Sequence, residues 1–75
     1  MRMANICGER IRQTRLKRGL SQVDISAALE VDHHVILDRS DISEIERQVR
    51  GLKDFELLAF AKVLDVSPVW LLDGQ

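Results

Sequence analysis

The chain has 75 residues, a formal net charge of −1 and one cysteine, Cys7. This length fits a single domain, 1–75, with a modest core, and a lone cysteine excludes an internal disulfide. Neither a signal peptide nor a long apolar run is visible, so the sequence predicts a soluble, cytoplasmic protein. Cys7 is most simply a small core residue; a redox or nucleophilic thiol is the alternative.

The charges are distributed unevenly along the chain. Residues 1–20 carry one acid, Glu9, against six basic side chains, which are Arg2, Arg10, Arg12, Arg15, Lys17 and Arg18. Residues 21–46 carry Arg39 against seven acids, and residues 47–75 carry four charges of each sign. The sequence therefore predicts a basic first segment and an acidic middle, whereas the net charge argues neither for nor against nucleic acid.

Apolar side chains at helical spacing predict a first helix over about 5–18, which Gly19 ends as a C-cap. A second helix is predicted over 21–32, because Ser21 is a good N-cap and an acid follows it three residues later. Its expected apolar face is formed by Ile25, Ala28 and Leu29.

The segment after the second helix is rich in bulky residues. Val35, Ile36 and Leu37 are β-branched or bulky and could form a short extended piece. Asp38 then caps a predicted third helix over 39–48, where a carboxylate suits the helix dipole.

The third predicted helix has two chemically different faces. On a helical wheel, Ile42 and Ile45 point to one side, with Val49 beyond them. Asp41 and Glu46 fall on the flanks, nearer the core side. The opposite face gathers Ser40, Ser43, Glu44 and Arg47, with Arg39 at its edge.

Two further helices complete the predicted set. The fourth, over 54–64, has an expected core stripe of Leu57, Leu58, Ala61 and Leu64. Ser67 followed by Pro68 predicts a last short helix over 67–72. Five helices without a strand of useful length predict an all-α, compact five-helix domain.

Three stretches of this pattern resemble one family. RIRQTRLKRGLSQVDIS, ISEIER and FELLAFAKVLDVSPVWLL, in this order and spacing, are similar to the phage-repressor class of helix-turn-helix proteins (Cro/Xre type). The resemblance covers roughly 6–72. It implies a lambda-repressor-like fold in which the second and third helices form the helix-turn-helix and the third enters the DNA major groove.

The resemblance also implies roles for individual side chains. Base reading falls to Arg39, Ser40, Ser43 and Glu44, since arginine suits guanine and a glutamate accepts a hydrogen bond from cytosine. Phosphate contacts fall to Ser21, Gln22, Arg47, Gln48, Arg50 and Lys53. Glu46, near the wrong helix end for an acid, is implied to form a partly buried ion pair with Arg15.

Three departures from the family pattern stand out. Glu30 occupies the place of the usual turn glycine, and about six extra residues around 33–37 lengthen the turn, as in a longer-turn subset of the family. Thr14 and Ser26 stand where the family usually has leucine and alanine, which predicts some loss of core packing.

Other combinations of residues give weaker indications of a functional site. His33 and His34 with Cys7 match no zinc spacing and are more simply solvated, so no metal or cofactor is predicted. Trp70 could stack on a ligand, but core or interface is the simpler interpretation. No catalytic arrangement is visible, so the protein is predicted not to be an enzyme.

The sequence therefore predicts a sequence-specific double-stranded DNA-binding transcriptional regulator, most simply a repressor that is cytoplasmic and associated with the bacterial nucleoid. No separate ligand-sensing or dimerisation domain is expected. A homodimer is predicted through the last helix, by Val69, Trp70 and Leu72, with Phe55 or Phe60 as further candidates. The alternative is a protein-interaction module on the same fold that no longer binds DNA, which the acidic middle segment favours.

Overall fold

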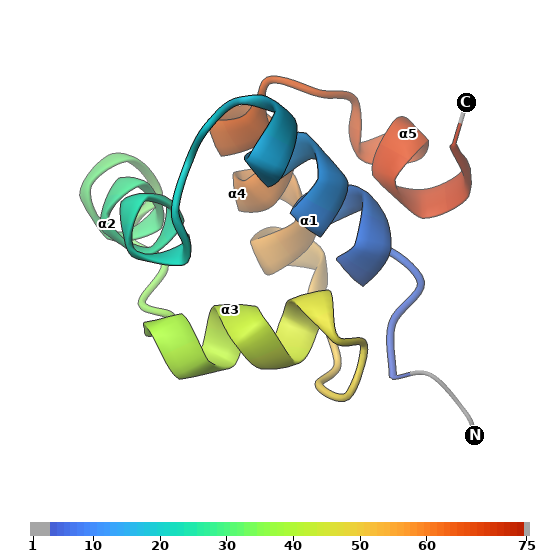
Figure 1. The fold of residues 1–75 in the computed structure, drawn as a ribbon, viewed down its shortest axis with the longest axis horizontal. Helices are drawn as coiled ribbons and strands as arrows, with labels where there is room; N and C mark the ends of the chain where they lie inside the picture. The colour runs from blue at the N-terminus through green and yellow to red at the C-terminus, as the bar shows by residue number, and fades with distance from the viewer. Residues whose placement is uncertain (1–3, 75) are drawn as a thin grey trace.

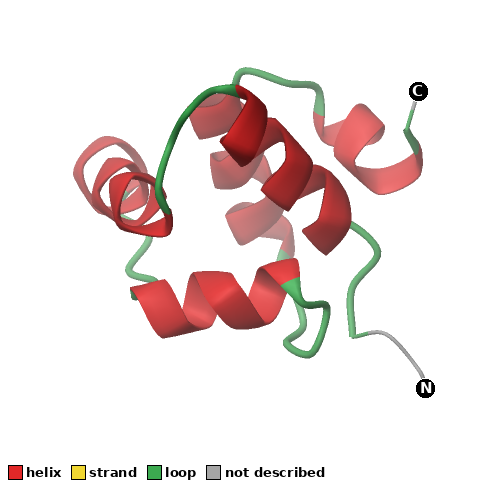
Figure 2. Cartoon of the chain, in the orientation of Figure 1, coloured by secondary structure: helices red, strands yellow, loops and turns green. Residues whose placement is uncertain are grey.

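The structure is a computed structural model that describes residues 4–74. Over this range the chain forms five helices and no strand (Figure 1, Figure 2). They are α1 (Gly8–Lys17), α2 (Gln22–His33), α3 (Arg39–Glu46), α4 (Asp54–Leu64) and α5 (Pro68–Asp73). The predicted all-α, five-helix fold is confirmed.

Helices α2 and α3 begin where the sequence places capping residues. The Ser21 hydroxyl accepts a hydrogen bond from the Asp24 amide at 2.9 Å, and the Asp24 carboxylate accepts one from the Ser21 amide at 2.8 Å. Asp38 and Asp41 form the same reciprocal capping box at the start of α3, with distances of 2.8 and 3.0 Å. Two of the acids around the third helix are therefore engaged in starting it.

Two helices are shorter than the sequence predicts. The first begins at Gly8 rather than near Asn5, because the Asn5 side-chain oxygen accepts the amides of Cys7 and Gly8 at 3.0 and 2.7 Å. The third ends at Glu46 rather than at 48, since Gln48 adopts a left-handed backbone with φ of 65°. Val49 consequently lies exposed and does not extend the apolar face of α3.

The turn between α2 and α3 starts later than the family pattern implies. Helix α2 continues through Glu30 to His33, and His34 takes the left-handed conformation, with φ of 56°. The His34 amide donates to the Glu30 carbonyl at 3.1 Å and the Val35 amide to the Leu29 carbonyl at 3.0 Å, so the helix closes on a left-handed residue. Part of the extra length is thus absorbed as additional helix.

The rest of the extra length contributes to the core. Val35 and Leu37 are 7% and 5% exposed, whereas Ile36 between them is 79% exposed, as an extended backbone dictates. No strand pairing forms here. The Ser26 hydroxyl donates to the Leu37 carbonyl at 2.6 Å, so this polar departure from the family pattern holds the longer turn against α2.

Every helix contributes to one core. The fully buried side chains are Ile11, Ile25, Leu29, Ile42, Ile45, Phe60, Leu64 and Leu71. Helix α1 packs against α3 and α4, and α4 also packs against α2. Helix α5 packs on α4 at the other side of the molecule (Figure 1).

The expected core stripe of α4 is partly wrong. Leu58 is 51% exposed and Leu57 only half-buried, while Ala59 and Phe60 are buried beside Ala61 and Leu64. The helix is apolar on most sides, so its spacing alone did not fix which side faces inward. Because Phe60 is fully buried, it is not available for the subunit contact that the sequence suggested.

Helices α1 and α3 approach each other closely at Gly8. A Cβ atom at this position would collide with the backbone carbonyl of Ile45 and lie 3.0 Å from that of Glu46. The Gln48 side chain closes the third side at 2.9 Å. Glycine is therefore required for the contact between the start of α1 and the end of α3.

We expect Gly8→Ala to lower the free energy of unfolding by about 1–3 kcal/mol or more, because backbone atoms must move to admit the methyl group. Urea denaturation measures the change. Gly51→Ala is the matched control, since the nearest atom to a Cβ there is the Ala4 carbonyl oxygen at 4.0 Å. Equal stability of the two variants would contradict the close approach.

Candidate DNA-binding interface

One carboxylate joins the first three helices. Glu46, at the end of α3, accepts two hydrogen bonds from the Arg15 guanidinium of α1, at 2.6 and 3.0 Å. Gln22, the first residue of α2, donates to the same carboxylate at 3.1 Å. The Arg15 and Glu46 side chains are 10% and 2% exposed, so this bidentate pair is largely withdrawn from water.

The remaining nitrogen of Arg15 also has a partner. Its second terminal nitrogen donates to the Leu20 carbonyl at 2.9 Å, in the turn between α1 and α2. Hydrogen bonding to Glu46 raises the pKa of Arg15 above its ordinary value, against the effect of burial, so the guanidinium stays charged. The pair that the resemblance implied is thus present, and each nitrogen of the Arg15 guanidinium has an acceptor.

A second polar clamp, at Asn5, holds the other end of the same contact. While its oxygen caps α1, its side-chain nitrogen donates to the carbonyls of Ile45 and Arg50, at 3.1 and 2.8 Å. A single amide therefore ties the start of α1 to the end of α3 and to the following loop. Sequence reasoning placed Asn5 in the first helix and missed this role, because its partners lie 40 and 45 residues away.

An open groove lies between the start of α2 and the exposed side of α3; we call it the α2–α3 groove. It is lined by Arg12, Arg15, Ser21, Gln22, Val23, Arg39, Ser40, Ser43, Glu44, Glu46 and Arg47. Four arginines against two glutamates give this surface a net charge of +2, although the whole chain carries −1. Arg15 and Glu46 neutralise each other, which leaves the positive excess on Arg12, Arg39 and Arg47.

The structure brings all four residues of the predicted base-reading set into this groove. Arg39 and Ser40 are exposed in the first turn of α3, and Ser43 and Glu44 are half-buried one turn later. Arg39 makes no side-chain hydrogen bond or ion pair within residues 4–74, so its guanidinium is available to a ligand.

The predicted phosphate-binding set divides into two groups. Ser21, Gln22 and Arg47 line the α2–α3 groove. Gln48, Arg50 and Lys53 do not; they lie in or beside the loop between α3 and α4. Gln48 packs against Gly8, and its side-chain nitrogen lies 3.4 Å from the Asn5 carbonyl oxygen. The Lys53 ammonium lies 5.9 Å from the centre of the Phe55 ring.

Arg50 is committed to a partner that the sequence reasoning overlooked. Its guanidinium donates to both carboxylate oxygens of Glu56, at 3.3 and 3.2 Å, and Glu56 also accepts the Lys53 amide at 2.9 Å. The Glu56 side chain is 4% exposed. Burial raises the pKa of Glu56, but the hydrogen bonds from Arg50 and the Lys53 amide outweigh it and hold that pKa below its ordinary value.

Other candidate sites receive no support from the geometry. Cys7 is buried in the core, and burial raises the pKa of its thiol, with a smaller opposing effect from Arg10. Over residues 4–74, no three His, Cys, Asp or Glu side chains gather as metal ligands would. Over the same range, no helix is both long and apolar enough to span a bilayer.

Comparison with known proteins agrees with this architecture. The family model "Helix-turn-helix domain" matches residues 8–75. The structure is similar to that of the P22 c2 repressor protein in complex with a synthetic operator, with a TM-score of 0.79 and 31% sequence identity over 95% of this chain and 98% of that one. A search of curated protein sequences found no match.

A second solved structure extends the comparison. It is the restriction-modification controller protein C.AhdI from Aeromonas hydrophila, with a TM-score of 0.74 and 32% identity over 87% of this chain and 89% of that one. The chain belongs to the phage-repressor-like helix-turn-helix family, as the sequence motifs indicated. In this fold α2 and α3 are the helix-turn-helix pair.

We expect Glu46→Gln to cost about 3–5 kcal/mol in the free energy of unfolding, because the buried Arg15 charge loses its partner. Chemical denaturation measures this loss. Glu9→Gln is the control on the exposed side of α1, where the carboxylate meets only the Gln13 side chain at 3.3 Å. A loss no larger than in this control would contradict the structural role of the pair.

The Arg50–Glu56 pair predicts a dependence of stability on pH. Since the pKa of Glu56 is lowered by folding, its contribution is complete above its ordinary value of 4.5 and is lost as the pH falls through the lowered value. We expect the stability difference between wild type and Glu56→Gln to shrink as the pH falls below 4.5. Denaturation of both proteins between about pH 3 and pH 7, at steps of about half a pH unit, measures this difference. A stability difference that does not change with pH would contradict the assignment.

Proposed function

We propose that the protein is a transcriptional repressor that binds double-stranded DNA in a sequence-specific manner and acts by occupying an operator. The observation that carries the proposal is the positive α2–α3 groove on a chain that is slightly acidic overall. The similar P22 c2 repressor is described in complex with an operator, which supports DNA as the partner.

In this proposal α3 enters the major groove of the DNA and reads base edges. Arg39 is suited to a bidentate contact with guanine, and Glu44 to accepting a hydrogen bond from the amino group of cytosine. Ser40 and Ser43 lie between them as shorter hydrogen-bonding groups. A glutamate among the readers penalises every base that cannot donate, and this favours a selective site over a general affinity for DNA.

The backbone of the DNA is held by neighbouring groups. Ser21 and Gln22 stand at the start of α2, where the first helical amides have no intrahelical acceptor and the dipole favours an anion. Arg47 adds a full positive charge at the end of α3. Gln48, Arg50 and Lys53 remain candidate phosphate contacts from the following loop, although Arg50 would have to share its charge with Glu56.

The protein-interaction alternative rested on the acids of the middle segment. Asp38 and Asp41 form the capping box of α3 and Glu46 is paired with Arg15. Glu44 is therefore the one carboxylate of this helix that lies in the groove outside a cap or ion pair among the described residues. The acidic composition does not produce an acidic surface there, which favours DNA over a basic protein partner.

Binding as a homodimer is part of the proposal, because two-fold repressors occupy two half-sites about one DNA turn apart. Val69 and Leu72 of α5 are exposed apolar side chains, and Trp70 beside them is half-buried. Phe55 is also exposed. These residues offer the apolar contact area for a second copy.

Selection of duplexes from a randomised pool, read at two salt concentrations, tests the proposal. We expect a palindromic sequence to be recovered, with an affinity that falls steeply with salt. Arg39→Ala should cost about 1–3 kcal/mol and relax the preference at one base position. Arg47→Ala should weaken binding to all sequences alike and lower the salt slope by about one unit for each copy in the dimer.

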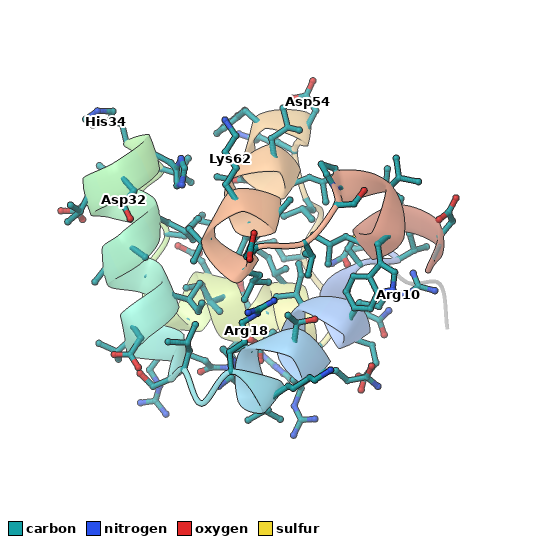
Figure 3. All side chains as sticks on the ribbon, turned by 90° about the horizontal axis from the view of Figure 1, so that it is seen from above. Arg10, Arg18, Asp32, His34, Asp54 and Lys62 are labelled. Carbon is teal, nitrogen blue, oxygen red and sulfur yellow. The ribbon has the colours of Figure 1, made fainter. Side chains whose placement is uncertain are left out.

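Lys62→Ala is the control for these variants, since Lys62 is an exposed cation on α4, away from the α2–α3 groove (Figure 3). It should bind as wild type does. Recovery of no common sequence by a folded chain would overturn the proposal. Arg50→Ala is unsuitable as a probe, because it would leave the buried Glu56 carboxylate without its cation.

A further inference from the structure

The basic side chains of α1 and of Arg18, the residue that follows this helix, differ in what they contact. Arg10 donates to the Leu71 carbonyl of α5 at 3.1 Å, and Arg18 donates to the Asp65 carbonyl after α4 at 3.3 Å (Figure 3). Arg15 is bound to Glu46. These three arginines serve the fold, two of them at the carbonyl-rich ends of helices, where a positive charge is favourable.

Arg12 is the exception among the arginines of α1. It is exposed and makes no side-chain hydrogen bond or ion pair with any of residues 4–74. It lies three residues before Arg15, so the two share one side of the helix. On that side Arg12 lines the α2–α3 groove together with Ser21, Gln22 and Arg39.

The position of Arg12 suits a phosphate better than a base. The proposed readers project from α3, whereas Arg12 comes from α1 and enters the groove on the side of the α2 N-terminus. Its neighbours there, Ser21 and Gln22, are themselves candidate phosphate contacts. A planar guanidinium with free donors matches the geometry of phosphate oxygens, and exposure means that little desolvation opposes the contact.

We propose that Arg12 binds a backbone phosphate of the DNA, so that the binding surface extends beyond the helix-turn-helix onto α1. This inference rests on the proposed function, because it assigns a further contact within the same complex. It adds an ionic contact to those of α2 and α3 and fixes the position of the strand that passes the start of α2.

The test compares wild type, Arg12→Gln and Lys17→Gln on the duplex recovered by selection. Lys17 is the matched control: it carries the same charge on the same helix but lines a separate hollow with Thr14, Arg18, Leu20 and Val66. Since the proposed complex holds two copies, we expect Arg12→Gln to lower the salt slope by about 1.8, about 0.9 for each copy, so that its affinity falls about 12-fold less than that of wild type between 50 and 200 mM salt. Base preference and the slope of Lys17→Gln should be unchanged.

A scan with single uncharged methylphosphonate linkages locates the contact. Neutralising the phosphate that Arg12 binds should weaken wild type and leave Arg12→Gln unaffected, while every other position affects both proteins alike. Identical profiles for the two proteins, or an altered base preference of Arg12→Gln, would overturn the inference and leave the proposed function standing. A folded wild type that binds no duplex would overturn both.

Discussion

The arrangement of the first three helices depends on the Glu46 carboxylate. It receives Arg15 from α1 and Gln22 from α2 while belonging to α3, so a single group sets how the end of α3 lies against the start of α2. Asn5 and Gly8 hold the start of α1 against the end of α3, the first by hydrogen bonds and the second by allowing close approach. Arg15, Gln22 and Glu46 themselves line the α2–α3 groove, so its shape depends on the contacts among them.

The partners of the acids around α3 explain why this segment contains so many of them. Asp38 and Asp41 satisfy backbone amides at the start of the helix, and Glu46 is neutralised by Arg15. The cations of α3, Arg39 and Arg47, have no comparable partner among the described residues. A segment that is acidic in composition therefore lines a groove of net positive charge, because three of its four acids are engaged within the fold, whereas Arg39 and Arg47 are left to solvent.

Local signals predicted the helices and the N-caps of α2, α3 and α5, and the family motifs predicted the pairing of Arg15 with Glu46. The features that were not predicted depend on contacts between residues far apart in the sequence. The roles of Asn5, Ser26 and Glu56 rest on partners that turn chemistry and periodicity do not reveal. Phe60 was misplaced because α4 is apolar on most sides, and Arg12 was overlooked because a basic helix does not show which of its cations the fold consumes. For Arg50 the sequence reasoning treated as free a cation that is paired with Glu56.

The longer turn has a consequence for how much variation in length this fold tolerates. The extra residues are added at the far end of α2, where His34 projects (Figure 3), while the groove is formed at the opposite end of that helix. The insertion brings its own buried anchors, Val35 and Leu37. Lengthening a loop costs little closure entropy, so chains of different length can keep the same spatial relation between α2 and α3. The length and sequence of the turn can therefore change without a change in the residues that face the groove.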